Sequence, residues 1–200
     1  MTELNQLGKE ISSCQACRLA EVRTRAVPGE GASKADIMFI GEAPGGREDQ
    51  IGRPFVGAAG KFYDELLYLA GLSRDEIFTT NVVKCRPPGN RDPLPDELLH
   101  CKPWLDRQIE LIKPRIIVTL GRFSMAYYFP GKIISKIHGK PVTNNGIIYF
   151  PMYHPAAALH RGGLKEVIKA DMQKIPALLA ESKMVEKASF EEPPRQMKLL

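Results

Sequence analysis

The sequence lacks any long hydrophobic run, since no apolar stretch reaches the roughly 18 residues that a membrane span needs. It also lacks the basic and then apolar leader that is typical of secreted proteins. From these two absences we expect a cytoplasmic protein that binds no membrane. Hydrophobic residues still make up 44% of the 200 residues, which is enough for an ordinary buried core in one domain.

Cysteine is scarce, and only four occur: Cys14, Cys17, Cys85 and Cys101. In the reducing interior of a cell, such a set is typical of metal ligands rather than of two disulfides. The first two form a C-x-x-C pair, whereas fifteen residues separate the second two, and either a zinc ion or an iron–sulfur cluster could be held. The wide second spacing favours the cluster. Either centre would join the N-terminal segment to the middle of the chain.

Short apolar segments alternate with helical patterns along the chain. Strands are predicted over 36–40, 77–83, 115–120 and 147–152, and helices over 57–70, 96–112, 121–129 and 163–181. This alternation predicts an α/β protein, a three-layer α/β/α domain around a central four-stranded, mostly parallel sheet. We expect residues 1–182 to form this domain and residues 183–200, which contain two prolines, to form a flexible C-terminal tail.

Polar residues lie at or just beyond the carboxyl ends of three predicted strands: Glu42, Asn81 and His154. Because the carboxyl ends of parallel strands meet at one edge of a sheet, a carboxylate, an amide and an imidazole should converge there. Each also has an ordinary structural explanation. Glu42 could face solvent, Asn81 could satisfy neighbouring backbone, and His154 could be a structural histidine.

Four short motifs make the interpretation more specific: Gly41-Glu-Ala-Pro-Gly45, Gly52-Arg-Pro-Phe-Val-Gly-Ala-Ala-Gly60, Thr80-Asn-Val-Val-Lys-Cys-Arg-Pro-Pro88 and His154-Pro-Ala-Ala157. In this order, with these cysteines, they resemble the family 4 uracil-DNA glycosylases, the thermophile-type enzymes with an iron–sulfur cluster. The resemblance runs from about Cys14 to Leu179. It implies a monofunctional enzyme that removes uracil from DNA and leaves an abasic site. It also implies a structural [4Fe–4S] cluster on the four cysteines and no catalytic divalent metal.

The resemblance implies a pocket for a uracil flipped out of DNA. Phe55 would stack on the base, and the Asn81 amide would match its O4 and N3–H edge. The backbone of Gly41, Glu42 and Ala43 would complete the pocket.

The same resemblance implies catalytic roles. His154 would face O2 of uracil and stabilise the negative charge that develops on the departing base. Glu42 would hold a water or stabilise the cationic sugar, and Glu48 is a second candidate for that role. Ala43 leaves this position without a water-activating side chain, so the general base is the least defined part of the prediction.

The net charge of +5 is compatible with DNA as a partner. Candidate DNA contacts are Lys84, Arg86, Arg91, His138, Leu159 and Arg161, of which the basic ones would contact phosphates unless they are only solvated surface charge. The segment after His154 would enter the minor groove. His138 also corresponds in position to a histidine with which related uracil-DNA-binding proteins form a covalent link to the sugar.

Three alternatives stay open from the sequence. The chain could be a uracil-DNA binder that traps the abasic sugar through His138, a metal-stapled domain that binds small phosphorylated molecules, or a glycosylase for a broader set of deaminated bases. We expect a monomer. A sliding clamp is a further candidate partner, through the C-terminal segment Gln196–Leu200.

Overall fold

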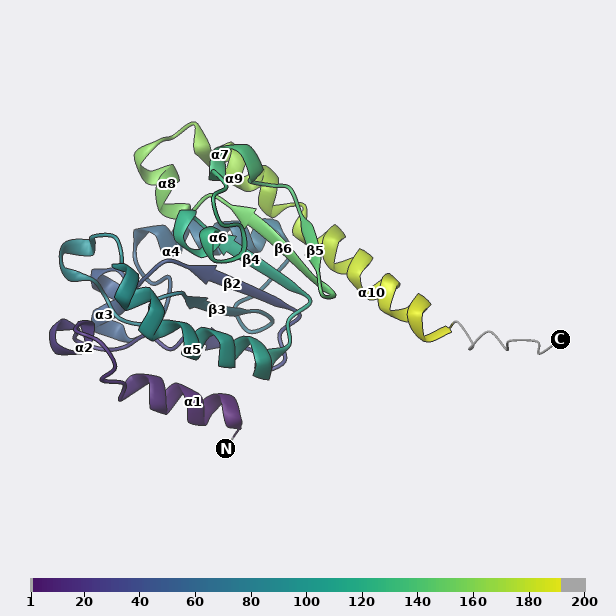
Figure 1. The fold of residues 1–200 in the computed structure, drawn as a ribbon. Coiled ribbons are helices and arrows are strands. Elements are labelled where there is room, and N and C mark those ends of the chain that lie inside the picture. Colours follow the sequence, from purple (N-terminus) through teal and green to yellow (C-terminus); the bar gives the residue numbers. More distant parts are fainter. Residues whose placement is uncertain (1, 192–200) are drawn as a thin grey trace.

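The computed structural model describes residues 2–191 of the chain (Figure 1). Its helices are α1 Glu3–Ser12, α2 Leu19–Val22, α3 Gly46–Ile51, α4 Ala58–Leu69, the 3-10 turn η1 Pro88–Asn90, α5 Pro95–Ile112, α6 Arg122–Tyr128, α7 Ile134–Ile137, α8 Pro155–His160, α9 Leu164–Met172 and α10 Ile175–Glu191. Its strands are β1 Glu30–Gly31, β2 Ile37–Gly41, β3 Phe78–Asn81, β4 Ile116–Leu120, β5 Val142–Asn144 and β6 Ile147–Met152.

The strands of residues 2–191 form one six-stranded sheet in the order β1-β3-β2-β4-β6-β5. The four central strands are parallel and are the four that the sequence predicted, whereas β1 and β5 pair antiparallel at the two edges. The predicted strand number of four is therefore corrected to six. The edge strands escaped prediction because two- and three-residue strands are too short to show a hydrophobic period. The Asn145-Gly146 turn, with φ of 49° and 78°, was a usable hairpin signal for β5.

Successive residues of the central strands face opposite layers of helices. Ile37 and Phe39 of β2 pack into a cluster with α4, α9 and the start of α10. Met38 and Ile40 pack into a second cluster with α1 and α5 on the other face. This period of two, with both faces buried, confirms the predicted three-layer α/β/α domain (Figure 1).

The predicted helix over 163–181 is two helices, α9 and α10, with a break at residues 173–174. Pro176 explains the break, because proline has no backbone N–H to continue the hydrogen-bond ladder of α9. Helix α10 continues to Glu191 and so overlaps the start of the predicted flexible tail. No proline or glycine occurs between Pro176 and Pro193, and nothing in that sequence ends the helix earlier. Residues 192–200, with the candidate clamp-binding segment, lie outside the described residues.

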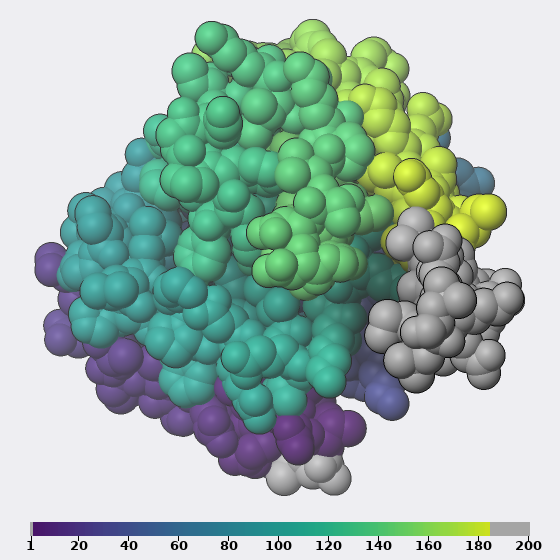
Figure 2. Space-filling view, turned by 45° about the vertical axis from the view of Figure 1, so that its right-hand side comes forward, coloured from purple at the N-terminus to yellow at the C-terminus, as the bar shows by residue number. Residues whose placement is uncertain are grey.

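The N-terminal helix α1 packs along α5, although about 90 residues separate them in the chain (Figure 1). In Figure 2 the purple N-terminal segment likewise lies against the teal segment that contains α5. Of the predicted metal ligands, Cys14 and Cys17 lie between α1 and α2, Cys85 lies between β3 and η1, and Cys101 lies on α5. Among residues 2–191, every helix is too short or too polar to cross a lipid bilayer.

Candidate functional site

The carboxyl ends of β2 and β3 lie side by side because Gly41 pairs with Asn81 in parallel register. Glycine at position 41 leaves room for both neighbours, since an added Cβ would lie 2.3 Å from Asn81 Oδ1 and 3.2 Å from Phe55 Cζ and would displace these side chains. The loop that follows, with Glu42 and Ala43, runs into α3. We call Gly41, Glu42, Phe55, Asn81 and His154 the strand-end site.

Asn81 is 2% exposed, yet its side-chain amide has no hydrogen-bond partner within residues 2–191. Neither amide atom is among the fully buried side-chain atoms that lack a partner in the described part of the chain, so the tip of the amide reaches solvent at the strand end. The ordinary explanation, that Asn81 satisfies neighbouring backbone, therefore does not hold for its side chain. An unpaired donor and acceptor at the edge of the sheet is suited to a ligand that supplies both partners.

His154 caps the N-terminus of α8, where its Nδ1 accepts a hydrogen bond from the Ala156 N–H at 3.1 Å. Because Nδ1 is the acceptor, the proton of the neutral ring resides on Nε2. Burial lowers the pKa of His154 to about 4, so the ring is neutral at physiological pH. The side chain thus presents one N–H donor in a fixed orientation.

Phe55 is 3% exposed and belongs to the core cluster that includes Phe39 and Tyr63. Its ring stacks on His154 with centroids 5.4 Å apart and lies tilted against Tyr63 with centroids 4.6 Å apart. Its backbone has a left-handed φ of 52°, a conformation that costs a non-glycine residue about 1 kcal/mol or more. Gly60 allows this turn, since a Cβ there would lie 1.9 Å from the Phe55 carbonyl oxygen.

The two candidate carboxylates have different surroundings. Glu42 is partly buried, and burial together with the negative charge of Asp92 raises its pKa, which Arg122 partly offsets. Glu48 instead accepts hydrogen bonds from the backbone N–H groups of Gly45, Phe55 and Val56. Because its carboxylate binds backbone N–H groups of the neighbouring loops, Glu48 has a structural role here. Glu42 is the carboxylate at the strand end.

Lys84 does not lie on the surface, contrary to its predicted contact with DNA phosphates. It is 1% exposed, and Nζ donates to Thr80 Oγ1 at 2.6 Å, Asn81 O at 2.7 Å and Gln108 Oε1 at 2.6 Å. Burial lowers the pKa of Lys84 to about 7. Its three donors are satisfied internally, so Lys84 supports the backbone of Asn81 and has none left for a phosphate.

The other candidate DNA contacts are distributed around the strand ends. Arg86 donates to Asn90 Oδ1 at 2.7 Å, and Arg91 forms a two-point ion pair with the buried Glu97 at 2.6 and 2.8 Å. Leu159 and Arg161, at the end of α8, are exposed.

His138 packs on the ring of Tyr153, the neighbour of His154, with centroids 4.8 Å apart. Its Nδ1 lies 2.6 Å from the buried carboxylate of Asp171. The structure thus places His138 near the strand ends but holds one of its ring nitrogens in an internal pair.

The four cysteines, brought together from three regions of the chain, line one small cavity. Three of the four sulfurs accept hydrogen bonds from N–H groups: Arg23 donates to Cys85 at 3.0 Å, the Lys84 backbone to Cys101 at 3.2 Å, and Trp104 to Cys14 at 3.3 Å. Such N–H···S contacts are typical of metal-bound thiolates. Within residues 2–191, no three Cys, His, Asp or Glu side chains are close enough to hold a single metal ion.

Sequence patterns did not single out Tyr63 and Arg74, which both contact Phe55 or its peptide. Tyr63 belongs to the apolar face of α4, and an aromatic at helical spacing is expected to be core. Arg74 lies in the turn between α4 and β3 and donates to the carbonyl oxygens of Pro54 and Phe55. No local signal in the sequence marks such a contact.

Comparison with known proteins gives a consistent result. A model of the uracil DNA glycosylase superfamily matches residues 28–175. The chain is 51% identical to the type-4 uracil-DNA glycosylase of Sulfurisphaera tokodaii over 89% of this chain and 86% of that protein. It is 50% identical to the one from Saccharolobus solfataricus, over 90% and 88%, and 44% identical to the one from Archaeoglobus fulgidus, over 89% and 94%. The protein with this strand-end site and these four cysteines therefore belongs to the type-4 uracil-DNA glycosylases of the uracil DNA glycosylase superfamily.

Proposed function

We propose that this protein excises uracil from DNA by hydrolysing the N-glycosidic bond, which leaves an abasic site for base excision repair of deaminated cytosine. The observation that carries the proposal is the strand-end site, in which a side-chain amide without a protein partner and a neutral imidazole donor accompany an aromatic ring. Membership in the type-4 family supports the same activity. Because uracil is unreachable inside a duplex, the base must be flipped into this site.

Asn81 reads the edge of the flipped base. Its Nδ2 donates to O4 of uracil and its Oδ1 accepts from N3–H, which supplies the partners that the amide otherwise lacks. Cytosine presents a donor and an acceptor in the opposite places, so both groups of Asn81 would stay unpaired, at about 1–3 kcal/mol each. Phe55 stacks on the base. The backbone of Gly41, Glu42 and Ala43 lines the other side.

His154 stabilises the departing base. When the C1′–N1 bond breaks, its electron pair moves onto the uracil ring and the sugar becomes cationic. The Nε2–H of neutral His154 donates to O2, where the negative charge gathers. Glu42 offsets the positive sugar and orients the water that attacks C1′. The proton of that water leaves to Glu42 or solvent, and uracil is released after taking up a proton.

Contacts with the DNA backbone are assigned to basic residues around the strand ends. The partly buried Arg86 and His138 and the exposed Arg161 are candidates for phosphates, whereas Arg91 is held mainly by Glu97. Leu159, which is 51% exposed on α8, is the apolar side chain that fills the space of the flipped base.

The four cysteines hold a [4Fe–4S] cluster in this proposal, as the resemblance to the family 4 enzymes implies. The fit rests on four thiols around one cavity with N–H donors aimed at their sulfurs. When bound, the cluster supplies a covalent cross-link between the N-terminal segment and the β3–α5 region, and no step of the reaction passes through it. The reaction uses no divalent metal.

The proposal is tested with a labelled oligonucleotide that contains one uracil, treated with alkali after incubation and analysed on a denaturing gel. Wild-type protein should cut at the uracil and not at thymine. His154→Ala should lower the rate constant about 100- to 1000-fold, since it removes one donor to a developing anion. Asn81→Asp should gain cleavage at cytosine, because a protonated carboxyl can donate to N3 and accept from the amino group. An oligonucleotide that wild-type protein leaves intact would contradict the function.

A second function, covalent trapping of the abasic sugar, has one specific observation in its favour. Asp171 holds Nδ1 of His138, which leaves Nε2 as the free nitrogen. On the same gel, a stable protein–DNA adduct that disappears in His138→Ala would replace hydrolysis with trapping. Turnover without an adduct would exclude it.

A further inference from the structure

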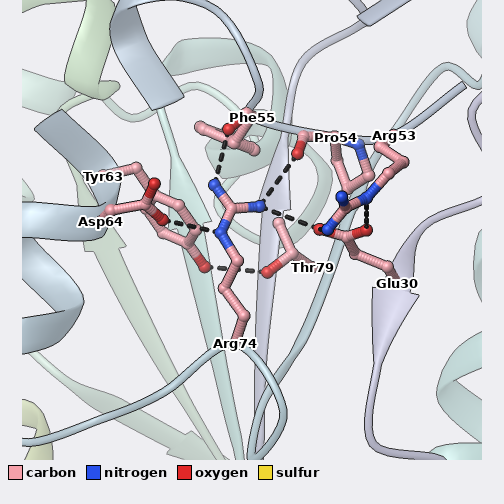
Figure 3. Close-up of polar contacts among 8 residues, drawn as sticks. All are labelled: Glu30, Arg53, Pro54, Phe55, Tyr63, Asp64, Arg74 and Thr79. Carbon is pink, nitrogen blue, oxygen red and sulfur yellow. Dashed lines mark hydrogen bonds and ion pairs between the residues drawn. The ribbon is translucent and has the colours of Figure 1, made fainter. Parts of the chain in front are cut away.

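We propose that Arg74 is a positioning residue for base recognition, acting through the strained peptide of Phe55. Figure 3 shows its guanidinium group between the loop that carries Phe55 and the carboxylates of Glu30 and Asp64. The inference rests on the proposed function, in that Phe55 is taken to stack on the flipped uracil. It adds a residue that lies outside the motifs and has no contact with the base.

The Phe55 peptide needs an external restraint. Its φ of 52° lies in the left-handed region that side-chain-bearing residues avoid, so contacts elsewhere in the fold must offset the cost of this conformation. The ring can lie against His154 and Tyr63 only while the backbone keeps this conformation. Whatever holds the peptide therefore decides where the stacking surface lies.

Arg74 supplies this restraint through the carbonyl oxygens. Nη2 donates to Phe55 O at 2.6 Å, and Nη1 donates to Pro54 O at 3.1 Å. The guanidinium group is itself fixed, because Nη1 also donates to Glu30 at 2.9 Å and Nε to Asp64 at 2.7 Å (Figure 3). The arginine side chain is only 23% exposed. One planar group with five donors can bind these four acceptors at once, which an ammonium group cannot do with the same geometry.

The backbone N–H groups of the same loop have a different partner from its carbonyl oxygens. Glu48 accepts from the backbone N–H groups of Phe55 and Val56, so the peptide is bound on both sides by oppositely charged groups. The ring rests on Tyr63, whose hydroxyl group is bonded to Thr79 of β3 at 2.9 Å. Phe55 is thus connected to the sheet and to α4, and Arg74 is the part of this arrangement that contacts its carbonyl oxygen.

The experiment compares Arg74→Met and Arg74→Lys with Arg53→Met as a matched control. Arg53 binds the same carboxylate, Glu30, at 2.6 Å, but its side chain is 60% exposed and donates to no loop carbonyl. We expect Arg74→Met to lower kcat/KM for uracil excision about 10- to 100-fold, the effect of misplacing a binding group by about 1 Å. Affinity for duplex DNA without uracil should not change. Arg74→Lys should resemble Arg74→Met, and Arg53→Met should resemble wild type.

A double-mutant cycle identifies the route of the effect. If Arg74 acts through the ring of Phe55, Arg74→Met should cause no further loss in a Phe55→Ala background. Losses that multiply, full activity in Arg74→Lys, or equal losses in Arg74→Met and Arg53→Met would each overturn the inference. Thermal unfolding of every variant checks that the assay temperature lies below its transition.

A readout that does not depend on activity separates this inference from the proposed function. Hydrogen exchange of the Phe55 and Val56 amides should be faster in Arg74→Met than in Arg53→Met or wild type. If wild-type protein cut no uracil-containing DNA, the proposed function would fail while the exchange data still tested the restraint. Unchanged exchange together with unchanged kcat/KM would refute the role of Arg74.

Discussion

His154 is held in one tautomer by the backbone of its own helix. The Ala156 N–H occupies Nδ1, so Nε2–H is the donor that faces outward from the cap. A charged imidazole would lose this capping bond, because its Nδ1 would then carry a proton. The depressed pKa and the local hydrogen bond therefore favour the same neutral state, and one side chain serves both helix α8 and the proposed chemistry.

This arrangement predicts a pH-dependent part of the stability. His154 titrates at about 4 in the folded protein, against 6.5 for an unperturbed histidine, so between these values the unfolded chain binds more protons. The contribution is fully present above pH 6.5 and declines as the pH falls toward 4. At 1.36 kcal/mol per pKa unit, its upper bound is about 3 kcal/mol.

The measurement is the free energy of unfolding of wild type and His154→Asn at pH 7 and pH 5. Asparagine keeps an oxygen that can cap α8 but does not titrate, so the variant should lose less stability on acidification than wild type. Parallel losses in the two proteins would show that His154 does not have a lowered pKa.

At the scale of elements, a buried lysine stabilises the carboxyl end of β3. Lys84 follows the strand and turns back to bond Thr80 and the carbonyl oxygen of Asn81, with Gln108 of α5 as its third partner. The basic neighbours of Lys84 in the sequence suggested a DNA contact. Only the packing of α5 over β3 shows that this amine faces inward.

Lys84→Met should destabilise the protein by about 1–3 kcal/mol, since it leaves the buried carbonyl oxygen of Asn81 without a donor. Lys61→Met is the matched control: Lys61 is exposed on α4, and its replacement should change the free energy of unfolding by less than about 0.5 kcal/mol. Denaturant unfolding of the two variants gives the comparison. Equal midpoints would mean that the three hydrogen bonds of Lys84 contribute nothing.

At the scale of the whole molecule, the cysteines join segments that are distant in the chain. Cys14 and Cys17 precede α2, whereas Cys85 precedes η1 and Cys101 lies on α5. Helix α1 packs on α5 beside this cavity, so the proposed cluster would stabilise the same docking of the N-terminal segment as the α1–α5 contact.

Protein purified without oxygen should accordingly be brown, with visible charge-transfer absorbance and the iron and sulfide content of a [4Fe–4S] cluster. Cys17→Ser should bleach this absorbance and lower the unfolding temperature, while Ser12→Ala at the end of α1 should do neither. Because the cluster stabilises the folded state only, its removal by oxidation and chelation should also lower the unfolding temperature. A colourless protein with one bound zinc would contradict the cluster.

The sequence by itself was sufficient to predict the parallel core of the sheet. It also identified the four cysteines as candidate ligands and the residues that lie at the strand ends. These follow from local information: the short continuous apolar runs of β2 and β4, the motif order and the spacing of residue types. Only the tertiary structure decided that Lys84 is buried, that Glu48 binds backbone amides, and that Arg74 holds the Phe55 peptide. Each of these depends on contacts between residues far apart in the chain, and the charge of a side chain does not reveal whether its partner is water, DNA or another part of the protein.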